Sequence, residues 1–375
     1  SSRPQRDVVA DRVPDDARRV LLLTGSFQVR GRSAGMIRLA ERLSSHGFAP
    51  SVICHDASRL SARQRSELAV TEYRYLNKPL LGRMVRRLAA RDLQETIPDL
   101  IHVQTRDQLG TGCWLSRRWS RPLVLGVHDI LRPGERFSLD PRWGRRVLAV
   151  SESVRDSLLE QSSLSPERVV VIPAGVDSPH VDDIAEVLDP DHVPVVGTAG
   201  PLEAIKGVPY LLDAAQQVLA TGRDVEFLVA GAGPEESSLR RLAHELEIGG
   251  RTTFIPDLSD FRTPLSAMDI FCLPSLQQGL GTIMLEAMSL GRPVIASAVG
   301  GVYSVVRDNE TGLVVPPRDS GALARRILEL LDAPVHARAI GTAARHAVSE
   351  EFGVERMVER TAALYREVLD DWDKQ

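Results

Sequence analysis

The alternation of short apolar runs with amphipathic helical stretches constrains this chain more than any other feature. Runs rich in Val, Ile and Leu end at a Gly, Pro or polar residue, and a stretch with apolar residues at helical spacing follows most of them. Runs that are apolar on both faces are typical of parallel strands covered by helices on both sides. The sequence therefore predicts an α/β fold with doubly wound parallel sheets.

The pattern occurs twice, with a break between the two sets. Strands are expected at 19–25, 51–54, 100–103, 123–127, 147–150 and 169–173, and again at 194–200, 226–230, 252–255, 269–275, 293–297 and 311–315. The sequence predicts a disordered tail at 1–16, a first Rossmann-like domain at 17–177, a linker at 178–194, a second Rossmann-like domain at 195–350 and a C-terminal segment at 351–375. The linker prediction rests on acidic residues, prolines and weak periodicity. The end of the chain is expected to be helical over 320–331 and 336–372.

Charge is distributed unevenly along the 375 residues, a length that suffices for two domains with full cores. Residues 1–176 carry 29 Lys and Arg against 19 Asp and Glu, whereas residues 177–375 carry 17 against 31. This asymmetry suggests two units with different partners. Lysine occurs only at Lys78, Lys206 and Lys374, so a lysine within a defined motif is notable.

The three cysteines show neither metal-binding spacing nor a disulfide framework, which favours a reducing compartment. No apolar run approaches the roughly 20 residues needed to cross a bilayer. We therefore expect a cytoplasmic protein without a metal site.

A glycine loop between an apolar strand and a helix is the strongest local candidate for a binding site. Gly279 and Gly281 follow the strand at 269–275, and a helix begins near Thr282. Backbone amides near glycine can approach an anion, and a helix N-terminus adds partial positive charge, so this loop suits a phosphate. Glu286, one turn into the helix, suits a diol such as a ribose. Alternatively, the glycines only form a tight turn and Glu286 is a solvated helix residue.

Two other strand ends carry candidate residues. His128 follows the strand at 123–127, where open α/β sheets bind ligands, although it can equally be a hydrogen-bonded turn histidine. Gly231 and Gly233 follow the strand at 226–230 and form only a weak dinucleotide signal. The third glycine and the later ribose-binding acid are missing, which argues against a nicotinamide dehydrogenase.

Residues 80–90 predict a basic amphipathic helix in the first half. Leu81, Met84, Val85 and Leu88 form its apolar stripe. Either this stripe packs on the domain's own sheet, or the helix contacts a membrane surface. Arginines also gather with tryptophans at 114–121 and 142–146, a composition found at membrane interfaces unless the tryptophans are buried. An anionic membrane at the inner face is therefore a candidate peripheral partner, and we expect no binding to nucleic acid.

A series of short motifs, in this order and spacing, resembles the retaining nucleotide-sugar glycosyltransferases of family 4, which have the GT-B fold. The resemblance covers nearly the whole chain after the first 16 residues. The matching pieces are Gly31, P-D-L-I-H-V at 98–103, V-H-D at 127–129, A-V-S-E at 149–152, I-P-A-G-V-D at 172–177, K-G at 206–207, G-A-G-P at 231–234, L-P-S at 273–275, G-L-G at 279–281, E-A-M at 286–288 and T-G-L-V at 311–314.

The resemblance implies two Rossmann-like domains that face each other across a cleft, with the acceptor in the first and the nucleotide-sugar in the second. It also implies that the last helix crosses back to the first domain. The expected catalytic residues are Lys206, Glu286, His128 and Gln278, with His128 near the donor sugar. The expected donor-binding residues are Gly31, Gly200, Gly231, Gly233, Pro256, Leu258, Gly279, Leu280, Gly281, Thr282 and Glu286, with the base near 254–258.

The implied reaction moves a sugar from a UDP- or GDP-sugar to a glycan, lipid-linked or small-molecule acceptor. It retains the anomeric configuration, without a metal ion or other cofactor, as in bacterial envelope polysaccharide biosynthesis. Two positions depart from the family pattern: Gln278 replaces the first of two glutamates, and Pro201 replaces an arginine expected beside the diphosphate. These departures keep open a non-catalytic nucleotide-sugar-binding homologue, and a GT-B epimerase is a further alternative.

Overall fold

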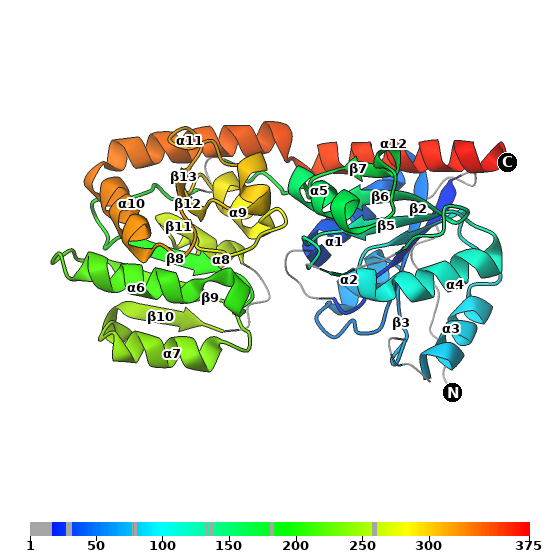
Figure 1. Cartoon of the computed structure of the whole chain (residues 1–375), viewed down its shortest axis with the longest axis horizontal. Helices are drawn as coiled ribbons and strands as arrows, with labels where there is room; N and C mark the ends of the chain where they lie inside the picture. Colours follow the sequence, from blue (N-terminus) through cyan, green and yellow to red (C-terminus); the bar gives the residue numbers. More distant parts are fainter. Residues whose placement is uncertain are drawn as a thin grey trace. The chain divides into compact units, whose positions relative to one another are not determined.

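A computed structural model describes residues 17–27, 32–76, 78, 81–132, 134–135, 138–180, 184–256 and 261–375. The chain divides into two compact units (Figure 1). The first runs to Gly175 and resumes at Val354, and the second spans Val176–Gly353. Each unit has its own parallel sheet and its own apolar core, so each is described by itself.

The first unit is built on a seven-stranded sheet with the order β3-β2-β1-β4-β5-β6-β7. All of its strand pairs are parallel. The strands are β1 (Arg18–Leu23), β2 (Phe48–Cys54), β3 (Val70–Glu72), β4 (Leu100–Val103), β5 (Leu123–Val127), β6 (Gly144–Ala149) and β7 (Val169–Val171). The strand order reverses between β1 and β4. In open α/β sheets ligands bind outside the carboxyl ends of the strands at such a switch point.

Helices connect these strands. They are α1 (Arg32–Arg42), α2 (Ala62–Glu67), α3 (Leu81–Asp92), α4 (Leu109–Trp119) and α5 (Glu152–Gln161), with short 3-10 turns η1 (Leu43–His46), η2 (Arg106–Gln108) and η3 (Pro166–Arg168). Three of these elements, α2, β3 and α4, were not predicted from the sequence. Two helix starts are capped locally: Ser61 forms a capping box with Gln64 at α2, and the Ser151 hydroxyl accepts from the Val154 amide at α5.

The second unit repeats the architecture with a six-stranded parallel sheet in the order β10-β9-β8-β11-β12-β13. Its switch point lies between β8 and β11. The strands are β8 (Val195–Ala199), β9 (Glu226–Ala230), β10 (Thr252–Ile255), β11 (Ile270–Leu273), β12 (Val294–Ser297) and β13 (Leu313–Val315). The predicted doubly wound parallel sheets are therefore confirmed in both halves.

The second unit also contains helices and short 3-10 turns. They are η5 (Ala204–Lys206), α6 (Val208–Leu219), α7 (Glu236–Glu245), η6 (Gly249–Arg251), α8 (Arg262–Ser266), α9 (Thr282–Ser289), η7 (Gly300–Ser304), α10 (Ser320–Asp332) and α11 (Pro334–Glu351). The core also takes in Val187 and Leu188, which fall within the predicted linker. The Leu188 amide donates to the buried Asp269 carboxylate over 2.6 Å. This part of 178–194 is therefore packed within the second unit.

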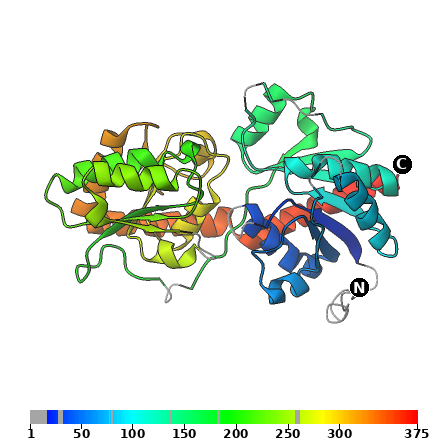
Figure 2. The same ribbon diagram turned by 90° about the horizontal axis from the view of Figure 1, so that it is seen from below.

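The chain passes between the units at two points. The helical pattern expected over 336–372 is broken at Phe352 and Gly353, and α12 (Val354–Asp373) belongs to the first unit. In Figures 1 and 2 this last helix, drawn in red, runs along the first unit. A side chain at Gly175 would place its Cβ 2.6 Å from the Val354 Cα, so the close approach of these two crossing segments requires glycine.

Helix α12 is held by an extensive apolar contact. Val358, Leu364, Tyr365, Val368 and Leu369 are buried in the same core cluster as the first strands. At about 1.5–3 kcal/mol for each large apolar side chain, this burial stabilises the docked helix by on the order of 10 kcal/mol. The core of the first unit therefore includes the end of the chain.

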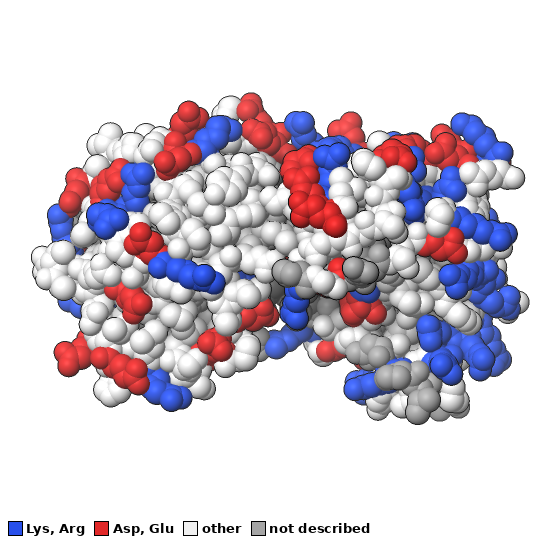
Figure 3. Space-filling view, viewed as in Figure 1, with Lys and Arg blue, Asp and Glu red and all other residues white. Residues whose placement is uncertain are grey.

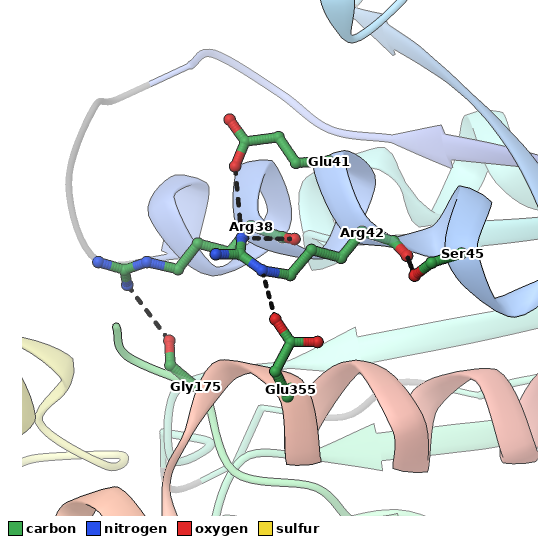
Figure 4. A network of polar contacts seen from close by, with 6 residues as sticks. All are labelled: Arg38, Glu41, Arg42, Ser45, Gly175 and Glu355. Carbon is green, nitrogen blue, oxygen red and sulfur yellow. Dashed lines mark hydrogen bonds and ion pairs between the residues drawn. The ribbon is translucent and has the colours of Figure 1, made fainter. Parts of the chain in front are cut away.

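Polar contacts fasten α1 to the same crossing (Figure 4). The Arg38 guanidinium donates to the Gly175 carbonyl over 3.2 Å, and Arg42 Nε donates to the Glu355 carboxylate over 2.8 Å. The carbonyl of Arg42 accepts from the Ser45 hydroxyl. One helix thus contacts both segments of the first unit where the chain leaves it and returns.

Candidate functional site

The switch point of the second sheet brings together two predicted residues that lie far apart in the sequence. Lys206 ends η5 after β8, and Gln278 lies in the loop after β11. Lys206 Nζ donates to Gln278 Oε1 over 3.1 Å, and the Ser275 hydroxyl donates to the same oxygen over 3.2 Å. The Leu276 amide also bonds the Ile205 carbonyl over 2.8 Å. The two loops therefore form one polar surface at the carboxyl edge of the sheet.

Glycine makes this junction possible. Gly207, directly after Lys206, has φ +64°, and a Cβ there would lie 2.0 Å from the Pro274 carbonyl oxygen. Any side chain would push the Lys206 loop away from the β11 loop. The residue after the predicted cation is thus glycine because the two backbones are in contact.

The predicted glycine loop lies beside this pair and leads into α9. Gly281 has φ +95° and stands at the N-cap of α9 without a side-chain cap. The Gly301 amide donates to the Gln278 carbonyl over 3.0 Å, and a Cβ at Gly301 would lie 1.9 Å from the Gly279 oxygen. The loop is therefore held against η7. Gly279 lies in a bend and Gly281 follows it at the N-cap of α9, where no side chain of the N-cap residue caps the helix. A helix start of this kind suits an anion.

The other predicted residues of the glycine loop and α9 differ in how far they are buried. Leu280 is 3% exposed, so its side chain belongs to the core and only its backbone can face a ligand. Thr282 and Glu286 are half-buried on the first turns of α9. Because residues four apart lie on one helix face, Glu286 stands one turn beyond Thr282 on the same side.

Three more predicted glycines lie at the same edge of the sheet. The Gly200 amide bonds the Ala230 carbonyl, and the Gly231 amide bonds the Ile255 carbonyl, which joins the ends of β8, β9 and β10. A Cβ at Gly231 would lie 1.9 Å from the Gly200 oxygen, and one at Gly233 would lie 2.3 Å from the Leu202 oxygen. These glycines therefore serve close packing of the loops.

The remaining predictions for the donor site differ in what the structure describes. Pro256 is exposed and directly follows β10. Leu258 and Gly31 lie outside the described residues. The predicted base-binding turn is therefore described only up to Pro256.

His128 follows β5 in the first unit, as expected, and is half-buried. A Cβ at Gly126 would lie 3.4 Å from both the His128 Nε2 and the His102 Nε2. Glycine at 126 thus leaves room for two imidazoles near the ends of neighbouring strands.

The second imidazole, His102, lies in the P-D-L-I-H-V motif but was not predicted as a site residue. His102 is 2% exposed on β4, and its Nδ1 shares hydrogen bonds with the Tyr365 hydroxyl at 2.5 Å and the Gln104 amide at 3.0 Å. Burial, followed by the charge of His128, lowers the pKa of His102 to about 3, so this imidazole is neutral. The signal in the sequence that could have identified His102 was a histidine within an otherwise apolar strand.

Within the described ranges, no group of three or more His, Cys, Asp and Glu is arranged to hold a metal ion. The three cysteines are free, and burial raises the pKa of the Cys54 thiol to about 12. No helix among the described residues has the length and apolarity to cross a membrane.

Known proteins match both halves of the chain. The family model described as glycosyl transferases group 1 matches residues 193–333, and the model described as glycosyltransferase family 4 matches residues 29–178. The alpha-maltose-1-phosphate synthase of Mycolicibacterium smegmatis is 31% identical over 276 residues, which cover 67% of this chain and 70% of that protein. The alpha-D-kanosaminyltransferase of Streptomyces kanamyceticus is 28% identical over 280 residues, covering 68% of this chain and 72% of that protein.

The fold is similar to that of a solved structure, Anabaena HepE in complex with UDP and glucose. The TM-score is 0.81 at 23% identity, and the match covers 93% of this chain and 100% of that chain. The family matches extend over most of both units, and the two parallel α/β sheets agree with this neighbour. The chain therefore belongs to glycosyltransferase family 4 and is a glycosyltransferase of the GT-B fold.

Proposed function

We propose that this glycosyltransferase takes its sugar from a UDP- or GDP-sugar bound at the carboxyl edge of the second sheet. The diphosphate lies between Lys206 and the N-terminus of α9, and the sugar is transferred with retention of anomeric configuration and without a metal ion. The complexes of HepE with UDP and glucose support a nucleotide-sugar donor.

The observation that carries this proposal is the contact of Lys206 Nζ with the neutral Gln278 amide. A carboxylate at 278 would offset the ammonium charge, whereas an amide oxygen accepts its hydrogen bond and leaves the positive charge in place. Gln278 therefore does not neutralise the ammonium, which can stabilise a leaving diphosphate. This arrangement also fits the absence of an arginine at Pro201, because an amide at 278, unlike a carboxylate, does not offset the charge of Lys206.

Glu286 and the loop amides complete the proposed donor site. The amides from Gly279 to Thr282 face the phosphate, and the Glu286 carboxylate accepts hydrogen bonds from the ribose hydroxyls. The base lies near Pro256, directly after β10.

A panel of nucleotides and nucleotide-sugars, screened by thermal shift, tests the donor. A true donor at about 100 times its dissociation constant should stabilise the protein by about 2.7 kcal/mol. NMR of the product of the transfer then reports its anomeric configuration, and activity should persist in EDTA. Binding without transfer to any acceptor would favour the non-catalytic homologue, and conversion of the donor sugar without an acceptor would favour an epimerase. A chain that no nucleotide-sugar stabilises would refute the proposal.

A further inference from the structure

Exposed apolar side chains concentrate on one helix of the first unit. In the part of the chain that the structure describes, eight large apolar side chains are exposed, and half of them are Tyr75, Leu81, Met84 and Leu88. Met84 is 68% exposed and the other three are 50–56% exposed. All four lie on α3 or in the turn before it. A gathering of this kind on a surface marks an interaction site.

The helix packs on its unit through small residues instead. Gly82, Ala89 and Ala90 are the buried residues of α3. A Cβ at Gly82 would lie 2.7 Å from the Leu76 carbonyl oxygen, so the helix approaches the preceding turn closely there. Of the predicted apolar stripe, Val85 is half-buried, whereas Leu81, Met84 and Leu88 are exposed. Most of the stripe is therefore not packed on the domain's own sheet, which was one of the two interpretations of the sequence.

Positive charge accompanies the exposed stripe. Between Tyr73 and Arg91 the sequence has five arginines, one lysine and no Asp or Glu. Arg83, Arg87 and Arg91 are exposed, and none of them forms an ion pair with a described residue. In Figure 3 blue side chains gather over the part of the first unit where Figure 1 labels α3 and α4. The spacing i, i+4, i+8 places these three arginines in a row along the helix beside the apolar stripe.

The tryptophans of the other two groups, Trp114, Trp119 and Trp143, are half-buried. The Trp143 ring lies 5.8 Å from the Trp372 ring of α12, and the Arg142 guanidinium lies over Trp143. Arg146 forms ion pairs with Glu367 and Asp371 of α12. Near α3, the Arg86 guanidinium lies over the Trp114 ring at 6.0 Å. Of the three predicted groups, α3 is therefore the one that combines exposed arginines with exposed large apolar side chains.

We propose that α3 docks the protein on an anionic lipid bilayer. Leu81, Met84 and Leu88 enter the boundary between headgroups and acyl chains, while the neighbouring arginines contact lipid phosphates. A second copy of the chain fits this surface poorly, because a two-fold contact of the same patch would bring arginines against arginines. The inference stands apart from the proposed sugar transfer, since vesicle binding requires neither donor nor acceptor.

Sedimentation of the full chain with vesicles tests this inference. The protein should pellet with phosphatidylglycerol vesicles at low salt and not with phosphatidylcholine vesicles. Binding should fall at about 1 M salt, where the Debye length is about 3 Å. The triple variant Arg83→Ser, Arg87→Ser, Arg91→Ser should bind about 100-fold more weakly, at roughly fivefold for each basic residue. Met84→Ser with Leu88→Ser should also weaken binding, by roughly 10-fold or more, without a change of charge.

A matched control variant distinguishes an effect of the α3 surface from an effect of the protein's net charge. Arg63, Arg241 and Arg325 are exposed arginines on α2, α7 and α10. Changing all three to Ser removes the same charge and should leave vesicle binding within about twofold. Equal losses in both triple variants would overturn the proposal, as would no pelleting with phosphatidylglycerol vesicles at low salt. The protein could instead form a dimer and not bind vesicles. If the double variant Met84→Ser, Leu88→Ser then dissociates that dimer, the surface is an interface with a second copy. All the altered side chains are exposed, so unchanged circular dichroism is expected throughout.

Discussion

Replacing Lys206 by Met should separate the binding of a diphosphate from the binding of a nucleoside. The substitution keeps an unbranched side chain that is one atom shorter, and it removes the ammonium group with its charge and its hydrogen bonds. The half-buried ammonium lies 3.1 Å from Gln278 Oε1, at the carboxyl edge where we place the diphosphate. A hydrogen bond to a charged group contributes about 1.5–3 kcal/mol. Since about 1.4 kcal/mol corresponds to a factor of 10, the nucleoside diphosphate should bind about 10- to 150-fold more weakly.

We also expect the Lys206→Met substitution to leave the fold intact. In the variant, Gln278 Oε1 keeps the hydrogen bond from the Ser275 hydroxyl, so no buried acceptor is left without a donor. The free energy of unfolding should therefore change by less than about 1 kcal/mol. Loss of affinity can then be read as loss of a ligand contact.

Titration calorimetry with the nucleoside and its diphosphate measures the effect directly. Nucleoside affinity should change less than about twofold. Lys206→Arg should restore most of the diphosphate affinity, and Lys78→Met serves as a control for the loss of one positive charge. Equal losses for nucleoside and diphosphate, in a folded variant, would refute the role of Lys206 at the phosphates.

Three further predictions concern the two units. Glu286→Ala should weaken binding of every ribonucleotide donor by a similar factor, about 10-fold or more, and unchanged affinity in calorimetry would make Glu286 purely structural. Gly301→Ala would place a Cβ 1.9 Å from the Gly279 oxygen, so it should cost about 1–3 kcal/mol in denaturant unfolding and weaken donor binding. Its control is Gly249→Ala, where a Cβ meets nothing within 4 Å, and equal effects of the two would contradict the argument. Because His102 has a pKa of about 3 when folded and an ordinary value of 6.5, the unfolded chain binds the proton first as pH falls. The free energy of unfolding should therefore drop by about 1.4 kcal/mol per pH unit between pH 6 and 4 from this group, and His102→Asn should lack that slope.

The local arrangement of the candidate site was accessible from the sequence. Gly279, Gly281 and Glu286 could be assigned to one loop and helix because strand runs, glycines and helical spacing are properties of neighbouring residues. The two sheets followed from the same periodicity. The departures at Gln278 and Pro201 were also visible, since they are identities at known positions in an ordered series of motifs.

Contacts between distant residues were decided only by the tertiary structure. The Lys206 to Gln278 hydrogen bond joins residues 72 positions apart, and the His102 to Tyr365 bond joins residues 263 positions apart. Periodicity shows that Leu81, Met84 and Leu88 share one face of a helix, but not whether anything covers that face. Val187 and Leu188 likewise were predicted to lie in a linker, because the core in which they are buried forms only when the second sheet folds. A pattern in the sequence determines which side of an element is apolar, whereas what that side meets depends on the packing of elements that the chain brings together from far apart.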